Sequence, residues 1–138
     1  MGRVERITLV LDATGATRTV NSVDAEAGRG LEGDYHDDLT LIAAEALDGL
    51  REDTGIELTG EQSRRNLLTR GIDLNALVGK TFRVGPIECV GVELCEPCAH
   101  LTSLTHPQVL RGMVHRAGLN ADILTDGEIA IGDPVVAQ

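Results

Sequence analysis

Cys95 and Cys98 stand three positions apart in the run ELCEPCAHLT at 93–102. The pair follows an apolar stretch that is typical of a strand, and the proline between the two thiols indicates a turn. Two thiols on such a turn could share a metal ion, exchange electrons as a dithiol, carry a sulfur atom or fill space. Cys89 lies earlier, in PIECVGVELC, where a small apolar core residue of a strand is the simplest interpretation.

The spacing of the pair alone does not decide its chemistry. A structural zinc site needs two further ligands. His100 and His106 are near in sequence, but their spacing after the cysteines matches no common zinc finger. A thioredoxin-like pair normally lies at a helix N-terminus, where the thiol pKa is lowered. The segment AHLTSLTHP that follows this pair carries little helical pattern, so neither role is favoured.

Arg64, Arg65 and Asn66 form a second candidate group. The planar guanidinium of arginine binds phosphate and other oxyanions in a bidentate manner. In an extended segment two adjacent side chains point to opposite faces, so we expect at most one of the two arginines to line a given pocket. A solvated turn is the plain alternative. The chain has only 12 lysines and arginines, which makes a local pair more suggestive than usual.

Two further motifs combine glycine with aspartate. In Gly33-Asp34-Tyr35-His36, the turn could orient a ligand or cap a loop, although a histidine in such a setting is more often a surface residue. Gly132-Asp133-Pro134 is typical of a turn before a final strand, with the carboxylate of Asp133 bonding local backbone N–H groups. We interpret this second motif as structural.

Composition argues against several classes of function. The net charge of −10 disfavours nucleic acid as a partner, because phosphate contacts need clustered lysines and arginines. Tyr35 and Phe82 are the only aromatic residues, too few for a base-stacking platform. Lys80 is the single lysine and stands at the start of an expected strand, so Schiff-base chemistry is not favoured.

The chain length and the cysteine count indicate a single cytoplasmic domain. The 138 residues are enough for one domain with a real core, which we assign to 1–138. The sequence has no apolar run of membrane-spanning length, and the N-terminal apolar stretch is too short for a signal peptide. An odd number of cysteines in a cytoplasmic protein indicates reduced thiols rather than a disulfide framework.

The elements that must position these residues are mostly short strands. Segments rich in Val, Ile, Leu and Thr alternate with glycine-containing turns. Strands are expected at 6–11, 17–23, 83–84 and 87–94, with a Gly85-Pro86 turn between the last two, and at two short segments joined by a hairpin turn at Asp126-Gly127. Apolar spacing predicts helices at 43–53, stopped near Gly55, and at 105–118, beginning near Pro107.

About seven short strands and two helices predict a mainly β fold. A closed or nearly closed β-barrel would remove exposed strand edges. Alternating βαβ units are disfavoured, because two helices are too few to serve as the crossovers that a parallel sheet needs.

Four segments in order along the chain resemble the MOSC domain family, named for the C-terminal domain of molybdenum cofactor sulfurases. These segments are GLEGDYH at 30–36, RRNLLTRGIDLNALVGKTFRVG at 64–85, CEPCAHL at 95–101 and DGEIAIGDPV at 126–135. The resemblance covers about residues 4–137. It implies a β-rich barrel, which agrees with the strand count, and a small stand-alone member of the family.

The resemblance also implies a role around the molybdenum cofactor, a pterin dithiolene that bears a phosphate. The functional cysteine of the family corresponds to Cys98, as a thiolate ligand of molybdenum or as a carrier of sulfur in a persulfide. Cys95 would be an auxiliary thiol. The set implied to contact the cofactor, mainly at its anionic end, is Arg64, Arg65, Asn66 and His36.

Other expectations concern what lies outside this domain. Pyridoxal phosphate belongs to the desulfurase domain of the sulfurases and is not expected here, so a cysteine desulfurase or a redox partner would be a separate protein. Asp37 and Asp38 stand where many relatives carry a basic residue, which makes that wall acidic. Two alternative functions remain: a cofactor-independent thiol protein that reacts with electrophiles, and a non-catalytic adaptor domain.

Overall fold

The computed structural model describes residues 1–95 and 117–138, and ten strands and three helical segments lie within these ranges. The strands are β1 (Gly2–Val10), β2 (Thr17–Val20), β3 (Ser22–Ala25), β4 (Leu39–Ala43), β5 (Leu67–Arg70), β6 (Thr81–Val84), β7 (Ile87–Leu94), β8 (Leu119–Ile123), β9 (Gly127–Ala130) and β10 (Pro134–Ala137). The helical segments are α1 (Ala44–Thr54), α2 (Gly60–Ser63) and the 3₁₀ turn η1 (Leu74–Leu77).

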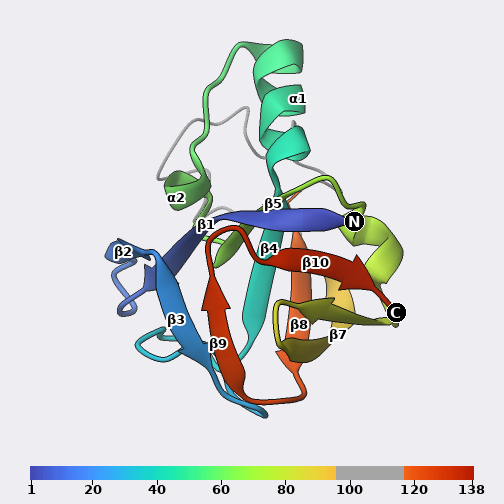
Figure 1. Ribbon diagram of the computed structural model, residues 1–138. Coiled ribbons are helices and arrows are strands. Elements are labelled where there is room, and N and C mark those ends of the chain that lie inside the picture. Colours follow the sequence, from blue (N-terminus) through green and yellow to red (C-terminus); the bar gives the residue numbers. More distant parts are fainter. Residues whose placement is uncertain (96–116) are drawn as a thin grey trace.

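Seven of the strands close into a barrel (Figure 1). The strand order is β10-β6-β7-β8-β4-β5-β1-β2, and β10 also pairs with β1, where Gly2 stands opposite Val135. This additional pairing closes the ring and leaves β2 attached beside β1. Only β4 and β5 pair in parallel; the other neighbours described are antiparallel. The predicted fold class, a mainly β closed barrel, is confirmed.

The barrel interior is filled by the inward-facing side chains of alternate strand residues. In β8, Leu119, Ala121 and Ile123 are buried, whereas Asn120 and Asp122 between them face outward. Cys89 of β7 is completely buried, and burial raises the pKa of its thiol to about 12. The predicted core role of Cys89 is therefore confirmed, and its thiol is protonated at neutral pH.

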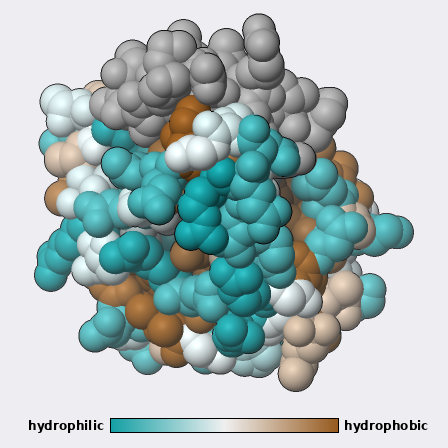
Figure 2. Space-filling model, turned by 90° about the horizontal axis from the view of Figure 1, so that it is seen from above, coloured by the Kyte–Doolittle hydropathy of each residue, from teal (hydrophilic) through white to brown (hydrophobic). Residues whose placement is uncertain are grey.

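Helix α1 packs against the outside of the barrel. Leu50 of this helix joins Ile42, Leu58 and Ala117 in a second hydrophobic cluster, separate from the barrel interior. The helix ends at Gly55, which adopts the left-handed conformation and donates its N–H to Arg51 O. The helix predicted at 43–53 is thus confirmed, together with its stop signal. Figure 2 looks down onto this end of the molecule, where the described residues are mostly hydrophilic.

Of the two predicted hairpins, one is confirmed and one is wrong. Val84 of β6 and Ile87 of β7 pair across the Gly85-Pro86 turn, as predicted. The Asp126-Gly127 segment instead leads from the barrel into a second, two-stranded sheet of β3 and β9. The Asp126 carboxylate accepts a hydrogen bond from Ala27 N at 2.7 Å. This turn is therefore stabilised by a distant segment and not by a partner strand next to it.

Two further differences concern the strands and helices, and one predicted helix is not tested. The strand expected at 17–23 divides into β2 and β3, which belong to different sheets. The short helix α2 was not predicted; it begins at Thr59 with a capping box formed with Gln62. The helix predicted at 105–118 lies, up to residue 116, outside the described residues. Among the helices of 1–95 and 117–138, none has the length and apolar character needed to cross a bilayer.

Candidate functional site

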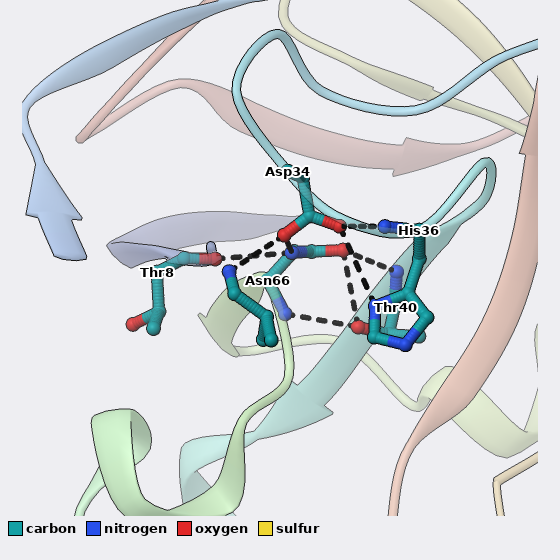
Figure 3. Close-up of polar contacts among 6 residues, drawn as sticks. Thr8, Asp34, His36, Thr40 and Asn66 are labelled. Atoms are coloured by element: carbon teal, nitrogen blue, oxygen red, sulfur yellow. Dashed lines mark hydrogen bonds and ion pairs between the residues drawn. The ribbon is translucent and has the colours of Figure 1, made fainter. Parts of the chain in front are cut away.

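The carboxylate of Asp34 organises the loop between β3 and β4. Its side chain is 0% exposed. Asp34 Oδ1 accepts hydrogen bonds from Val10 N at 2.7 Å and Asn66 Nδ2 at 3.0 Å, and Oδ2 accepts one from His36 N at 3.1 Å. Figure 3 shows the carboxylate at the centre of these contacts. Because a buried carboxylate is tolerated only when donors surround it, this network fixes the backbone at His36.

Asn66 connects this loop to three strands. Its Nδ2 also donates to Thr8 O in β1 at 3.0 Å, and its Oδ1 accepts from both the N–H and the hydroxyl of Thr40 in β4, at 3.1 and 3.2 Å. The residue is 2% exposed and stands just before β5. Every hydrogen-bonding position of this amide is used within the protein. The side-chain amide of Asn66, which was expected to contact the cofactor, is thus engaged within the protein and donates one of its hydrogen bonds to Asp34.

His36 stands at the surface beside the buried carboxylate. Its Nδ1 lies 3.6 Å from Asp34 Oδ2, and its side chain is 55% exposed. The imidazole also meets the ring of Tyr35 edge-on, with 5.2 Å between ring centroids and 84° between planes. The position of the ring is thus set by a charge on one side and an aromatic edge on the other.

Arg64 terminates α2 in an unusual backbone conformation. With φ 60 and ψ 20, it is the one non-glycine residue in the left-handed region among those the structure describes. Its NH2 nitrogen (Nη2) donates to Gly15 O in the β1–β2 loop at 2.7 Å. A Cβ added at Gly15 would overlap with the guanidinium, so any larger residue there would displace the end of the Arg64 side chain. Left-handed backbone at an arginine costs about 1 kcal/mol, and such strain concentrates at functional sites.

Arg65 turns in a different direction from Arg64. Its Nε donates to Ala117 O at 2.7 Å, just before β8. For the described residues, this is the single side-chain hydrogen bond of Arg65, so both Nη nitrogens keep N–H groups for another acceptor. The chain at Arg64 and Arg65 is therefore not extended, contrary to the expectation. The left-handed turn at Arg64 separates the two guanidiniums.

Both arginines nevertheless line one cavity, together with His36. The cavity has a volume of about 410 Å³ and is open to solvent. It is lined by Val10, Asp12, Ala13, Gly15, Tyr35, His36, Arg64 and Arg65. The expectation that at most one arginine lines a given pocket is therefore wrong, because the turn at Arg64 lets the two side chains approach the cavity from different sides.

The acidic residues near the cavity affect it to different degrees. Asp12 lines the cavity, and its carboxylate accepts hydrogen bonds from the hydroxyl and N–H of Thr14, which lower its pKa. Asp37 and Asp38, expected to make one wall acidic, do not line this cavity. Two arginines and a histidine thus face one lining carboxylate among the described residues, which suits an anionic group.

Cys95 lies close to the backbone that Arg65 contacts. It is half-buried and packs against the hydrophobic cluster of Ile42, Leu50, Leu58 and Ala117. Its N–H donates to Gly118 O at 2.8 Å. Cys98, the expected functional thiol, lies outside the described residues. Cys95 immediately precedes the segment 96–116 and is hydrogen-bonded to Gly118, which follows Ala117, the residue that Arg65 contacts.

Sequence reasoning missed two residues that build this site. Gly15 accepts a hydrogen bond from the guanidinium of Arg64 and leaves space for it. Thr40 supplies both groups that donate to the side-chain oxygen of Asn66. The Gly33-Asp34 motif was a partial signal, since it marked a turn, but nothing in it indicated that the carboxylate is buried.

The comparisons with known proteins agree with this architecture. The MOSC domain family matches residues 29–136. The YuaD protein from Bacillus subtilis has a TM-score of 0.87 at 14% identity, covering 98% of this chain and 94% of that one. YiiM from Geobacillus stearothermophilus has a TM-score of 0.78 at 15% identity, covering 100% and 75%. YiiM from Escherichia coli has a TM-score of 0.67 at 17% identity, covering 96% and 69%.

At these identities the structural likeness shows a shared fold. The comparison with curated proteins gives no match. The family match extends over most of the chain and includes the arginine pair and the loop of Asp34 and His36. This chain belongs to the MOSC domain family.

Proposed function

We propose that this chain binds the molybdenum cofactor or carries a sulfur atom for it, with Cys98 as the reacting thiol. The observation that carries the proposal is the convergence of Arg64, Arg65 and His36 on one cavity. The family is associated with this cofactor. When bound, the cofactor would supply redox chemistry at molybdenum, which no amino-acid side chain provides.

The residues of the cavity fit the anionic end of such a group. The Nη nitrogens of Arg65 and the guanidinium of Arg64 offer donors in the planar arrangement that a phosphate accepts. His36 adds a third group to the same cavity, a ring that can donate a hydrogen bond and that is cationic when protonated. In this proposal Asn66 positions His36 through Asp34 and does not contact the ligand.

The position of Cys98 in the sequence, soon after Cys95, supports its role in this proposal. Cys98 follows Cys95 by three positions, and a chain of that length spans at most about 11 Å. Cys95 is hydrogen-bonded to Gly118, and Arg65 to the neighbouring Ala117. A thiolate in this region would benefit from the positive charge of the arginines, which stabilises the ionised form.

Sulfur transfer to Cys98 requires no oxidant. The Cys98 thiolate would attack the outer sulfur of a persulfide on a donor protein, forming a new S–S bond as the donor S–S bond breaks. The donor leaves as a thiolate, and Cys98 holds the persulfide, so one sulfur atom moves with no net change in electrons. A cysteine desulfurase is the class of protein that forms such a donor persulfide. In this role Cys95 is the auxiliary thiol next to the acceptor.

Native mass spectrometry of the freshly purified protein tests the proposal. Expression in a host that makes molybdenum cofactor should give either a cofactor adduct or a mass increase of about 32 Da for one added sulfur. Cys98→Ser should abolish the adduct or the added sulfur, whereas Cys95→Ser should reduce it less. A wild-type protein that carries neither species, even after incubation with a persulfide donor, would contradict the proposal.

A further inference from the structure

Tyr35 presents an aromatic ring on the wall of the cavity that Arg64, Arg65 and His36 share. The residue is 56% exposed, whereas Phe82, the other aromatic residue of the chain, is completely buried in the barrel. Because the cavity is open to solvent, a molecule that enters it can meet the ring of Tyr35 directly. Of the two aromatic side chains, Tyr35 is therefore the one that a ligand can reach.

The backbone at Tyr35 is fixed on both sides. Tyr35 N donates to Val10 O at 2.7 Å, at the end of β1. The carboxylate of Asp34, the preceding residue, accepts from Val10 N at 2.7 Å and from His36 N at 3.1 Å. A tyrosine on such a turn has only two side-chain torsions to immobilise when it binds a ligand, so the cost in conformational entropy is low.

The contact with His36 leaves a flat face of Tyr35 open. The planes of the two rings meet at 84°, with 5.2 Å between the ring centroids. In an edge-on pair, one ring covers at most one face of the other, so His36 leaves at least one face of the phenol available for stacking. One ring is too few for a strand of nucleic acid, which stacks successive bases, but it is enough for a single heterocycle.

The aromatic ring and one of the arginines are held by the same hairpin. Tyr35 is hydrogen-bonded to Val10 at the end of β1, and Arg64 is hydrogen-bonded to Gly15 in the loop that follows. All four residues line the cavity. Its volume of about 410 Å³ lies within the range of about 300–1,000 Å³ that is usual for sites of small ligands. The cavity thus combines a group that suits an anion with a surface that suits a flat ring.

We propose that Tyr35 stacks on the ring of a planar heterocyclic ligand whose anionic group binds Arg64 and Arg65. This inference rests on the proposed function and names the class of ligand that the cavity selects, an aromatic heterocycle joined to a phosphate or a similar anion. The pterin and the phosphate of the molybdenum cofactor meet both requirements. The arginines select the anionic group, and Tyr35 selects a flat aromatic ring over a saturated group.

Two substitutions separate the face of the ring from its hydroxyl. Tyr35→Phe keeps the face and removes the hydroxyl, whereas Tyr35→Leu keeps an apolar side chain and removes the face. The probes are the phosphate ester of 6-hydroxymethylpterin, followed by its fluorescence, and inorganic phosphate, measured by its displacement of the pterin ester. Tyr35→Leu should bind the pterin ester about tenfold more weakly and inorganic phosphate with unchanged affinity. Tyr35→Phe should bind both probes within about threefold of the wild type.

Leu11→Ala is the matched control. Leu11 is 44% exposed and directly follows Val10, but it does not line the cavity. Its replacement should leave both affinities unchanged. The melting temperature of Tyr35→Leu without ligand should stay within about 3 °C of that of the wild type, because Tyr35 is largely exposed.

Each other outcome overturns the inference. If Tyr35→Leu binds the pterin ester as the wild type does, the ring does not contact the ligand. A loss in Tyr35→Phe as large as that in Tyr35→Leu would assign the contact to the hydroxyl. An equal loss in Leu11→Ala would show that the effect is not specific to the cavity. A parallel loss of affinity for both probes, or a larger fall in melting temperature, would assign a structural role to Tyr35.

The same measurements distinguish this inference from the proposed function on which it rests. If the wild type binds no pterin ester while Cys98 still acquires sulfur, the inference fails and the sulfur-carrying form of the proposed function stands. If neither occurs, both fail.

Discussion

Gly15 and Arg64, 49 positions apart in the sequence, form a matched pair: the guanidinium lies where a side chain at Gly15 would be. The Gly15 carbonyl accepts a hydrogen bond from the same guanidinium. The φ of 88 favours glycine at this position, and the absence of a side chain leaves the space that the Arg64 guanidinium occupies. The position of Arg64, one of the two arginines proposed to bind an anion, therefore depends on the backbone of the β1–β2 loop at Gly15.

Gly15→Ala should therefore displace Arg64 and weaken anion binding. We expect a loss of about 2 kcal/mol in the free energy of unfolding, part of it from the left-handed backbone and part from the overlap. Gly28→Ala is the matched control, because Gly28 has a φ of 73 but open space around it. Urea unfolding should show the larger loss for Gly15→Ala. Combining Gly15→Ala with Arg64→Ala should bring the loss at Gly15 down to that of the control; an unchanged loss would show that the overlap has no energetic effect.

Replacing Arg65 should weaken the binding of a phosphorylated ligand more than the binding of the same ligand without its phosphate. In Arg65→Ala we expect the ratio of affinities for 6-hydroxymethylpterin phosphate and unphosphorylated 6-hydroxymethylpterin to fall about tenfold, since a charge-assisted hydrogen bond contributes about 1.5–3 kcal/mol. Arg83→Ala is the control, because Arg83 pairs with Glu88 at the surface and does not line the cavity. An equal fall in both affinities would mean that Arg65 only supports the fold. Fluorescence titration of both probes provides the measurement.

The sequence predicted the elements that depend on local residue patterns. It failed to predict those that depend on contacts between residues far apart in the chain. The barrel follows from short segments rich in β-branched residues, and the Gly85-Pro86 hairpin joins strands that are adjacent in the chain. The Asp126-Gly127 turn was misassigned because its carboxylate binds Ala27, 99 positions away. Likewise, the arginine pair could be recognised as a candidate anion site from residue type, but its geometry depends on Gly15 and on a left-handed residue that no local pattern specifies.

Asn66→Asp should destabilise the protein in a way that depends on pH. The substitution places a second carboxylate at the position where Asn66 Nδ2 now donates to Asp34 Oδ1 at 3.0 Å. Two buried carboxylates repel each other, and we expect a loss of about 3 kcal/mol at neutral pH. Protonation of either group removes the repulsion, so the difference in melting temperature from the wild type should shrink as the pH falls. A difference that does not change with pH would contradict a direct contact between the two side chains.

Cys89 should make the protein less stable in alkali. Its pKa is raised from 9.0 to about 12 by burial, so the unfolded chain loses this proton at a lower pH than the folded chain. The contribution of this group to stability is therefore complete below a pH of about 9 and falls as the pH rises toward 12. Cys89→Ala should cost about 1 kcal/mol at neutral pH through the lost packing. Its free energy of unfolding should then decline less steeply than that of the wild type between about pH 8 and about pH 10. Parallel pH profiles in urea unfolding would contradict this assignment.

The pairing of Gly2 with Val135 has a consequence for synthesis on the ribosome. Of the seven barrel strands, β1 is translated first, and its neighbour β10 is translated last. Until then, β1 and β6 each keep an edge with unpaired N–H and C=O groups, a state that invites pairing with other chains. The ring can close only after translation of β10, so the nascent chain has a period in which a chaperone or rapid release matters most.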